Sequence, residues 1–229
     1  MDFVLKSVFC GVFITIFAYE IGVFIKKKFN FAIFNPLLIS IILIILLLKV
    51  LDIDYTVYED GAGLISFLLT PATVALAIPL YEQIEPLKKN WQAIIVGILS
   101  GALTSALCVL VLSVIFRLDH KMYVTLLPKS ITTAIGMGVA EEIGGIVTIA
   151  VAVIIVTGIF GNMIAEGVCR LFNITEPVAK GIGIGSASHA IGTTKAMEMG
   201  DIEGAMSSLS IAVSGITTVL VASLFSYIY

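Results

Sequence analysis

A lysine and several hydroxyl side chains lie together in an otherwise apolar stretch near the middle of the sequence. The stretch reads Pro128-Lys129-Ser130-Ile131-Thr132-Thr133. Proline is favoured in the first turn of a helix, where unpaired N–H groups and the positive end of the helix dipole attract anions. A cation and hydroxyl groups at the same place would add charge and hydrogen bonds. We therefore predict a carboxylate-binding segment made by Lys129, Ser130, Thr132 and Thr133.

The charge of Lys129 admits a second interpretation. A lysine at the centre of a bilayer costs roughly 2.5–3.5 kcal/mol on insertion scales, so it needs a partner or a water-filled cavity. However, Lys129 follows Met122 by only seven residues. Its long side chain could therefore extend to the membrane interface instead of binding a ligand.

A second group of polar residues surrounds a histidine in a glycine-rich segment. The segment reads Gly181-x-Gly183-x-Gly185-Ser186-Ala187-Ser188-His189-Ala190-Ile191-Gly192-Thr193-Thr194-Lys195. Ionisable side chains inside membrane segments are usually functional, and histidine titrates near neutral pH. We predict Ser188, His189, Gly192 and Thr193 as substrate-binding residues and His189 as a candidate for proton coupling. A hydrogen-bonded structural histidine and close helix packing by the glycines are the alternatives.

No enzyme signature is visible in the sequence. GxSxG and HExxH motifs are absent, and no carboxylate pair stands in a suitable setting. Cys10, Cys108 and Cys169 are far apart in apolar segments, so they predict neither a zinc site nor a disulfide. No basic stripe suggests nucleic-acid binding. We expect a protein that is not an enzyme and that uses neither a cofactor nor a metal.

The composition places these polar residues in a membrane protein. The chain has 229 residues, is 59% hydrophobic and has a mean hydropathy of +1.11. Only 13% of its residues are charged, with a net charge of −3, whereas soluble proteins have about 25% charged residues. Backbone polar groups in a bilayer must pair internally, and long unbroken apolar runs favour helices. We predict an all-α polytopic membrane protein in contact with the lipid bilayer.

About seven or eight membrane segments are expected, all in a single transmembrane domain over residues 1–229. Plain helices are predicted over about 3–25, 33–51, 91–116, 146–171 and 205–229. Three irregular segments, rich in Pro or in Gly, Ser and Thr, cover about 61–84, 122–144 and 177–199. Irregular backbone at membrane depth is tolerated only where protein or a water-filled cavity covers it. We therefore predict that these three segments are broken or re-entrant helices.

Two further patterns bear on transport and orientation. Residues 72–77 (ATVALA) align with residues 187–192 (ASHAIG) at an offset of 115, a weak similarity that predicts an internal repeat or arises by chance. Many transporters are built from repeats whose interrupted helices meet at a substrate site near the membrane midplane. The basic clusters Lys26–Lys28 and Lys88–Lys89 are expected on the cytoplasmic side, which places the N-terminus outside.

Three stretches of the chain resemble the LrgB/CidB family of bacterial membrane proteins. They are PKSITTAIGMGVAEEIGGI at 128–146, VTGIFGNMIAEGV at 156–168 and AKGIGIGSASHAIGTTKAMEMG at 179–200. The likeness covers nearly the whole chain and is most specific at Pro-Lys-Ser-x-Thr-Thr and His-x-x-Gly-Thr. The sequence departs from the family pattern at Ala134, where a proline is expected, and at Gly138, where an acidic residue is expected.

The resemblance implies two functions. Bacterial members are described as antiholin-like regulators of murein hydrolase activity and cell lysis, usually encoded with a small LrgA/CidA-type membrane protein. Plastid members carry glycolate and glycerate, and some bacterial pairs are linked to pyruvate movement. The resemblance therefore implies a multi-pass protein of the bacterial cytoplasmic (inner) membrane with an LrgA/CidA-like partner. Whether the protein also forms a homo-oligomer is left open. Because polar residues lie on interrupted helices, we expect a transporter of small monocarboxylates, with antiholin-like regulation as the alternative.

Overall fold

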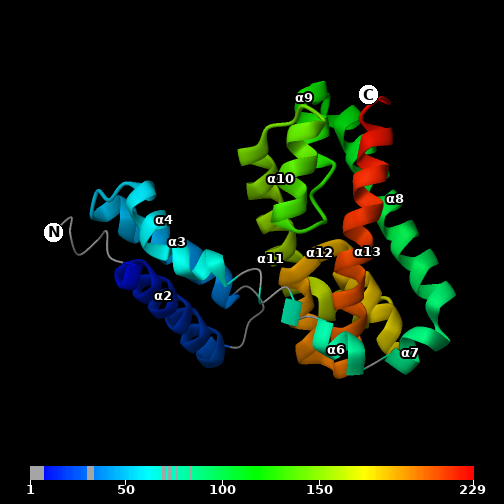
Figure 1. The fold of residues 1–229 in the computed structure, drawn as a ribbon, viewed down its shortest axis with the longest axis horizontal. Coiled ribbons are helices and arrows are strands. Elements are labelled where there is room, and N and C mark those ends of the chain that lie inside the picture. The colour runs from blue at the N-terminus through cyan, green and yellow to red at the C-terminus, as the bar shows by residue number, and fades with distance from the viewer. Residues whose placement is uncertain (1–7, 30–33, 69–70, 72–73, 76, 83) are drawn as a thin grey trace. The chain divides into compact units, whose positions relative to one another are not determined.

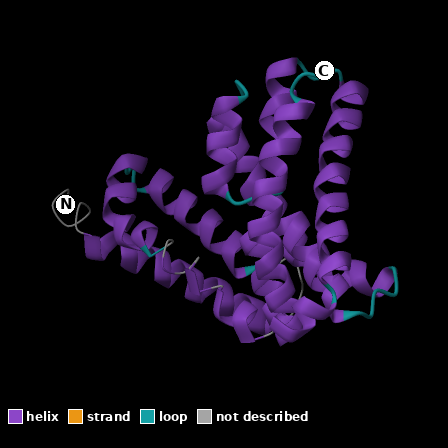
Figure 2. Ribbon diagram, turned by 45° about the vertical axis from the view of Figure 1, so that its right-hand side comes forward, coloured by secondary structure: helices purple, strands orange, loops and turns teal. Residues whose placement is uncertain are grey.

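The computed structural model describes residues 8–29, 34–68, 71, 74–75, 77–82 and 84–229. These residues form helices joined by short turns, and no strand occurs among them (Figure 2). Four of the helices are long and apolar enough to cross a membrane, namely Phe9–Phe29, Trp91–Phe116, Val147–Leu171 and Asp201–Phe225. The all-α class is therefore confirmed for the described residues. The number of seven or eight membrane segments stays a prediction.

The chain divides into two compact units, residues 1–75 and 76–229, and the single transmembrane domain expected over residues 1–229 stays a prediction. The first unit contains α2 (Val8–Phe29), α3 (Pro36–Val50) and α4 (Tyr55–Phe67). Helix α2 packs against both α3 and α4, and the hydroxyls of Thr15 and Tyr58 lie 2.7 Å apart. The side chains of Asn35 and Asp54 cap α3 and α4, respectively, by accepting hydrogen bonds from backbone N–H groups. Such caps satisfy donors that a helix start leaves unpaired.

The second unit contains the predicted site residues. Its elements are α6 (Ala77–Glu82), α7 (Ile84–Lys89), α8 (Trp91–Phe116), α9 (His120–Leu126), α10 (Thr133–Glu142), α11 (Val147–Leu171), α12 (Pro177–Met199) and α13 (Asp201–Phe225). The expected plain helices over 91–116, 146–171 and 205–229 correspond to α8, α11 and α13. Helix α12 packs most extensively against α13 and next against α11. Figure 1 shows α9 near the C-terminus and α12 toward the end that holds α6 and α7.

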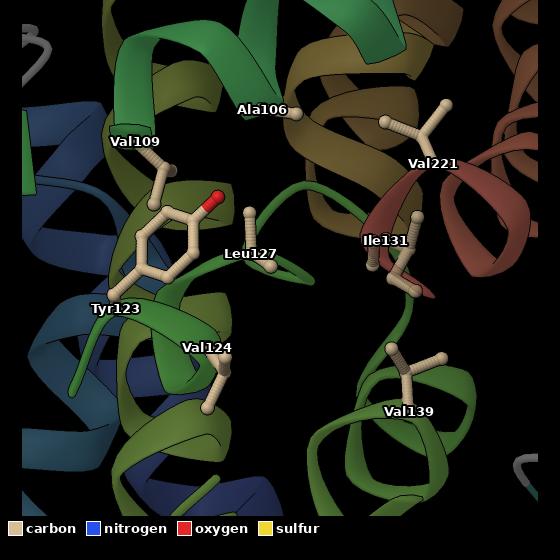
Figure 3. Packing of buried hydrophobic residues seen from close by; sticks show 9 residues of the cluster. Ala106, Val109, Tyr123, Val124, Leu127, Ile131, Val139 and Val221 are labelled. Carbon is tan, nitrogen blue, oxygen red and sulfur yellow. The ribbon is translucent and has the colours of Figure 1, made fainter. Parts of the chain in front are cut away.

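The irregular segment over 122–144 consists of two helices joined by a turn. The chain leaves the helical path after Leu126, and Thr132 forms the extended N-cap of α10. Val124 of α9 and Val139 of α10 lie in one buried hydrophobic cluster with Ile131 of the connecting turn (Figure 3). The chain beyond α10 returns to α9, because the backbone N–H of Ile146 donates to Oγ1 of Thr125 at 2.8 Å. The turn over 127–132 is therefore the tip of a helical hairpin, which we call the first hairpin.

The irregular segment over 177–199 is interrupted at His189. The backbone of His189 has φ 42° and ψ −142°, which is not helical. The two halves of α12 then lie side by side, since Ile184 and Ala196 pack in one buried cluster with Ala165 of α11. Lys180 from the first half and Lys195 from the second half also line one cavity. Helix α12 therefore folds back on itself and forms a second hairpin with His189 at its tip.

The third irregular segment, about 61–84, falls partly outside the described residues. Residues 69–70, 72–73, 76 and 83 are not described. The described parts of the segment belong to α4 and α6. Half of the ATVALA stretch proposed as one copy of an internal repeat also lies outside the described residues, so the repeat stays a prediction.

Both hairpin tips reach the middle of α8. The hydroxyl of Ser130, in the first tip, lies 2.9 Å from the hydroxyl of Ser105 in α8. One turn earlier in α8, a Cβ atom at Gly101 would lie 3.2 Å from Cβ of Ser186, near the second tip. The first hairpin starts just after the end of α8, whereas the first half of α12 contacts the beginning of α8 through Gly97. The two hairpins therefore approach the centre of α8 from opposite ends.

A glycine allows α12 to approach α13 closely. A Cβ atom at Gly185 would overlap the backbone oxygen of Ser207 and lie 2.8 Å from its Cα. We expect Gly185→Ala to destabilise the protein by about 1–3 kcal/mol, the usual cost of overpacking. Gly167→Ala is the matched control, because a Cβ there meets no atom within 4 Å and alanine favours a helix. Thermal unfolding in detergent should show a lower midpoint for Gly185→Ala only; equal midpoints would contradict the packing.

Candidate functional site

A cavity of about 370 Å³ that contains several hydroxyl groups lies between α8, the tip of the first hairpin and the first half of α12. We call it the Lys129 cavity. Its walls are formed mainly by small and hydroxyl-bearing residues, which are Gly97, Ser100, Gly101, Thr104, Ser105, Cys108, Lys129, Ser130, Gly183, Ser186 and Ala187. The cavity therefore brings a cation and several hydroxyl groups together where both hairpins approach α8.

Among the described residues, Lys129 is the only charged one that lines this cavity. Its Nζ donates a hydrogen bond of 3.1 Å to Oγ of Ser130, which in turn lies 2.9 Å from Oγ of Ser105. In the part of the chain that the structure describes, no carboxylate forms an ion pair with Lys129. An ammonium has three donors and the partly buried group needs a compensating charge. The arrangement can therefore accept an anion from the cavity.

A buried hydroxyl also lacks a protein partner at this cavity. Ser186 Oγ is buried and, among the described residues, makes no hydrogen bond. Buried polar groups are nearly always paired with protein or water, so an exception calls for an explanation. Because Ser186 lines the Lys129 cavity, a bound water or ligand atom would satisfy its hydroxyl.

Sequence reasoning missed the contribution of α8. Ser100, Thr104 and Cys108 recur every fourth residue, and Gly101 and Ser105 lie beside them. Residues at this spacing share one face of a helix, and all five line the cavity. The signal in the sequence was a stripe of small and hydroxyl residues in an otherwise apolar helix.

His189 is held in place by α11. Its side chain is buried, and Nε2 lies 3.0 Å from the backbone oxygen of Ile154. A carbonyl oxygen only accepts, so Nε2 carries the proton in this bond. A Cβ atom at Gly158 would lie 2.6 Å from Cε1 of His189, so a larger residue there would displace the ring. This environment fits the alternative in which His189 is a hydrogen-bonded structural residue. His189 is not among the residues that line the Lys129 cavity.

The other residues predicted around His189 mainly support the break in α12. Thr193 Oγ1 donates to the backbone oxygen of His189 at 2.9 Å and lies 2.7 Å from Oγ of Ser207 in α13. Gly192 packs closely against Ser188, where a Cβ would lie 2.5 Å from Cβ of Ser188. Ser188 lines a separate apolar cavity of about 230 Å³ rather than the Lys129 cavity.

The predicted threonines of the first hairpin lie at the start of α10. Thr132 is the N-cap residue and Thr133 the first helical residue, and Thr132 makes no side-chain capping bond. Neither lines the Lys129 cavity, unlike Lys129 and Ser130. The structure therefore joins Lys129 and Ser130 in one cavity with Ser186. The other predicted residues lie elsewhere in the two hairpins, namely Thr132, Thr133, Ser188, His189, Gly192 and Thr193.

The long apolar helices and the hairpin breaks between them define an all-helical membrane protein. A model of the LrgB-like family matches residues 15–228 of the chain. The antiholin-like protein LrgB of Bacillus cereus (strain B4264) is 36% identical to this chain over 216 residues, which cover 94% of each protein. The protein of the same name from Bacillus anthracis (strain CDC 684 / NRRL 3495) gives the same values. The chain therefore belongs to the LrgB-like family, as its motifs indicated. No solved structure matches the chain.

Proposed function

We propose that this protein carries small monocarboxylates, of the glycolate, glycerate or pyruvate type, across a bacterial cytoplasmic membrane. The observation that carries the proposal is the Lys129 cavity. It combines a partly buried ammonium, which pairs with no carboxylate of the described chain, with the unsatisfied hydroxyl of Ser186. A substrate carboxylate would supply both the charge and the acceptors that these groups need.

The cavity is large enough for a small hydroxy or oxo acid, and its ammonium and hydroxyl groups would bind the oxygen atoms of such an acid. The carboxylate would accept hydrogen bonds from Lys129 and Ser130, and the helix dipole at the start of α10 would add a favourable field. The substrate's own hydroxyl or carbonyl oxygen would pair with Ser186 or with Thr104 and Ser105 of α8. Such paired polar groups reject analogues that lack the oxygen more strongly than an apolar pocket could.

The arrangement of hairpins favours a carrier. We propose that α8, α11 and α13 span the membrane and that the two hairpins enter it from opposite sides as re-entrant segments. Transporters with interrupted helices bind substrate near the midplane and rock one group of helices against another. Placing Lys88 and Lys89 in the cytoplasm puts the ends of α12 on the cytoplasmic side, because α8 begins directly after α7.

The names of the relatives favour a second candidate function more directly than they favour transport. Both relatives are named antiholin-like proteins, so the chain is also a candidate regulator of murein hydrolase activity and lysis. Such a regulator would act through assembly in the membrane with a small LrgA/CidA-like protein. It would need packing surfaces but not a lysine cavity. Under either candidate function, the protein lies in the lipid bilayer and the small LrgA/CidA-like protein is its proposed partner.

Uptake into proteoliposomes, combined with a lysis assay, separates the two candidates. Purified protein, with and without the small partner, would be tested with labelled glycolate, glycerate and pyruvate under imposed pH gradients. We expect saturable uptake of at least one of them. Absence of uptake by folded protein under every condition, together with full control of lysis in cells by Lys129→Met, would favour the antiholin-like regulator.

A further inference from the structure

A large charged cavity lies where the two ends of α12 meet the end of α11. It has a volume of about 710 Å³, and we call it the charged vestibule. Its charged lining residues come from α11 and from both halves of α12, and they are Glu166, Arg170, Lys180, Lys195 and Glu198. None of these residues lines the Lys129 cavity. The vestibule is therefore a separate feature at one end of the second hairpin.

Lys195 is the centre of the ion pairs in the vestibule. Its Nζ lies 3.2 Å from a carboxylate oxygen of Glu166 in α11 and 3.2 Å from one of Glu198. Its side chain is 21% exposed, whereas the side chains of Glu166 and Glu198 are 42% and 53% exposed, so solvent and ions can reach these pairs. The pair with Glu166 fastens the second half of α12 to α11. A carboxylate that entered the vestibule would compete with Glu166 and Glu198 for the same ammonium.

The smaller apolar cavity shares lining residues with both the vestibule and the Lys129 cavity. The vestibule and the apolar cavity share Cys169, Ile174 and Lys180. The apolar cavity and the Lys129 cavity in turn share Gly183 and Ala187. The three cavities therefore follow one another along the first half of α12. The middle one offers few polar partners, so an anion would cross it rather than rest there.

Gly183 lines both the apolar cavity and the Lys129 cavity. We call its position the junction between these two cavities. A Cβ atom at this position would meet no atom within 4 Å, although Gly181 and Gly185 on either side pack tightly against α13. A side chain at Gly183 would therefore project into free space instead of forcing the helices apart. The residue keeps the junction open.

We propose that the three cavities form the route of the substrate on this side of the protein, with the charged vestibule as a second carboxylate-binding station. The inference rests on the proposed transport of monocarboxylates and deepens it. A carboxylate at the vestibule exchanges with Glu166 or Glu198 on Lys195. This exchange loosens the second half of α12, which begins directly after His189, and lets the substrate pass Gly183 to Lys129.

The route is tested with Gly183→Phe, in which the ring fills the junction. We expect labelled glycolate flux into proteoliposomes to fall at least tenfold. Gly167→Phe is the matched control, because Gly167 is an α11 residue that also has no atom within 4 Å of a Cβ and lines none of the three cavities. It should keep its flux.

A second variant tests the junction even if Gly183→Phe fails to fold. Gly183→Cys, with Cys10, Cys108 and Cys169 replaced by alanine, would be reconstituted first and then treated with an anionic thiol reagent. Loss of flux after treatment, and its slowing by glycolate, supports the route. Full flux after complete modification, or full flux in folded Gly183→Phe, overturns it.

Lys195 tests the vestibule as a binding station. Lys195→Gln should raise the half-saturating glycolate concentration for flux about tenfold, whereas Lys195→Arg should restore it. An unchanged value in Lys195→Gln would overturn the role of the vestibule. If wild-type protein shows neither flux nor glycolate binding, the proposed function fails first. If wild-type protein transports glycolate normally and the Gly183 and Lys195 variants do so as well, only the proposed route is wrong.

Discussion

Lys129→Met is expected to weaken saturable monocarboxylate flux by one to two orders of magnitude while leaving the protein at least as stable as the wild type. Hydrogen bonds to charged groups contribute about 1.5–3 kcal/mol. Losing one to the substrate should lower the ratio of maximal rate to half-saturating concentration roughly 10- to 150-fold. Stability should not fall, because methionine removes a partly buried charge that forms no ion pair within the described chain.

Two further variants make this prediction specific. Lys129→Arg keeps the positive charge and should retain part of the flux, although the broader guanidinium fits the hydrogen bond to Ser130 less well. Lys121→Met removes an exposed lysine at the start of α9 and should change neither flux nor stability. Flux assays in proteoliposomes and thermal unfolding in detergent provide the two readouts. Normal flux in folded Lys129→Met would show that the cavity is not the substrate site.

His189→Ala is expected to abolish flux and to lower stability. The variant removes the hydrogen bond from Nε2 to the backbone oxygen of Ile154. The cost should be about 0.5–1.5 kcal/mol, with a further loss from the space that the ring leaves. Without this contact the tip of the second hairpin is no longer fixed against α11. Thermal unfolding and flux measurements on the same preparation check both effects.

His189→Gln separates a structural role of the histidine from proton coupling. The glutamine amide can still donate to the oxygen of Ile154 but does not titrate. If His189 carries a coupling proton, we expect His189→Gln to recover stability and to carry substrate down its own gradient without a response to a pH gradient. Flux that still follows the pH gradient in this variant would assign His189 a purely structural role.

The sequence predicted those parts of the fold and site that depend on local chemistry. Long apolar runs have few structures available in a bilayer, so α8, α11 and α13 lie close to their expected ranges. Lys129 could be singled out because an ammonium in an apolar stretch is costly without a partner or a cavity. Ser130 follows it directly, and both do line one cavity.

Features that depend on contacts between distant residues could not be predicted in this way. The position of His189 depends on the backbone of Ile154, 35 residues away, which no local pattern reveals. Glycine enrichment indicated close packing in α12 but not that the helix turns back at His189. The face of α8 that lines the cavity was missed because its small residues also suit an ordinary membrane helix. Ser186 gained importance only when its hydroxyl proved to lack a partner.

Counterflow is the most direct test of carboxylate transport through the Lys129 cavity. Proteoliposomes loaded with unlabelled glycolate would be diluted into a trace of labelled glycolate, and the internal label would be followed over time. A carrier with a saturable site should produce a transient accumulation of label above equilibrium in wild-type protein and in Lys121→Met, but not in Lys129→Met. Simple equilibration without accumulation in the wild type, or accumulation that persists in Lys129→Met, would contradict the proposed site and its function.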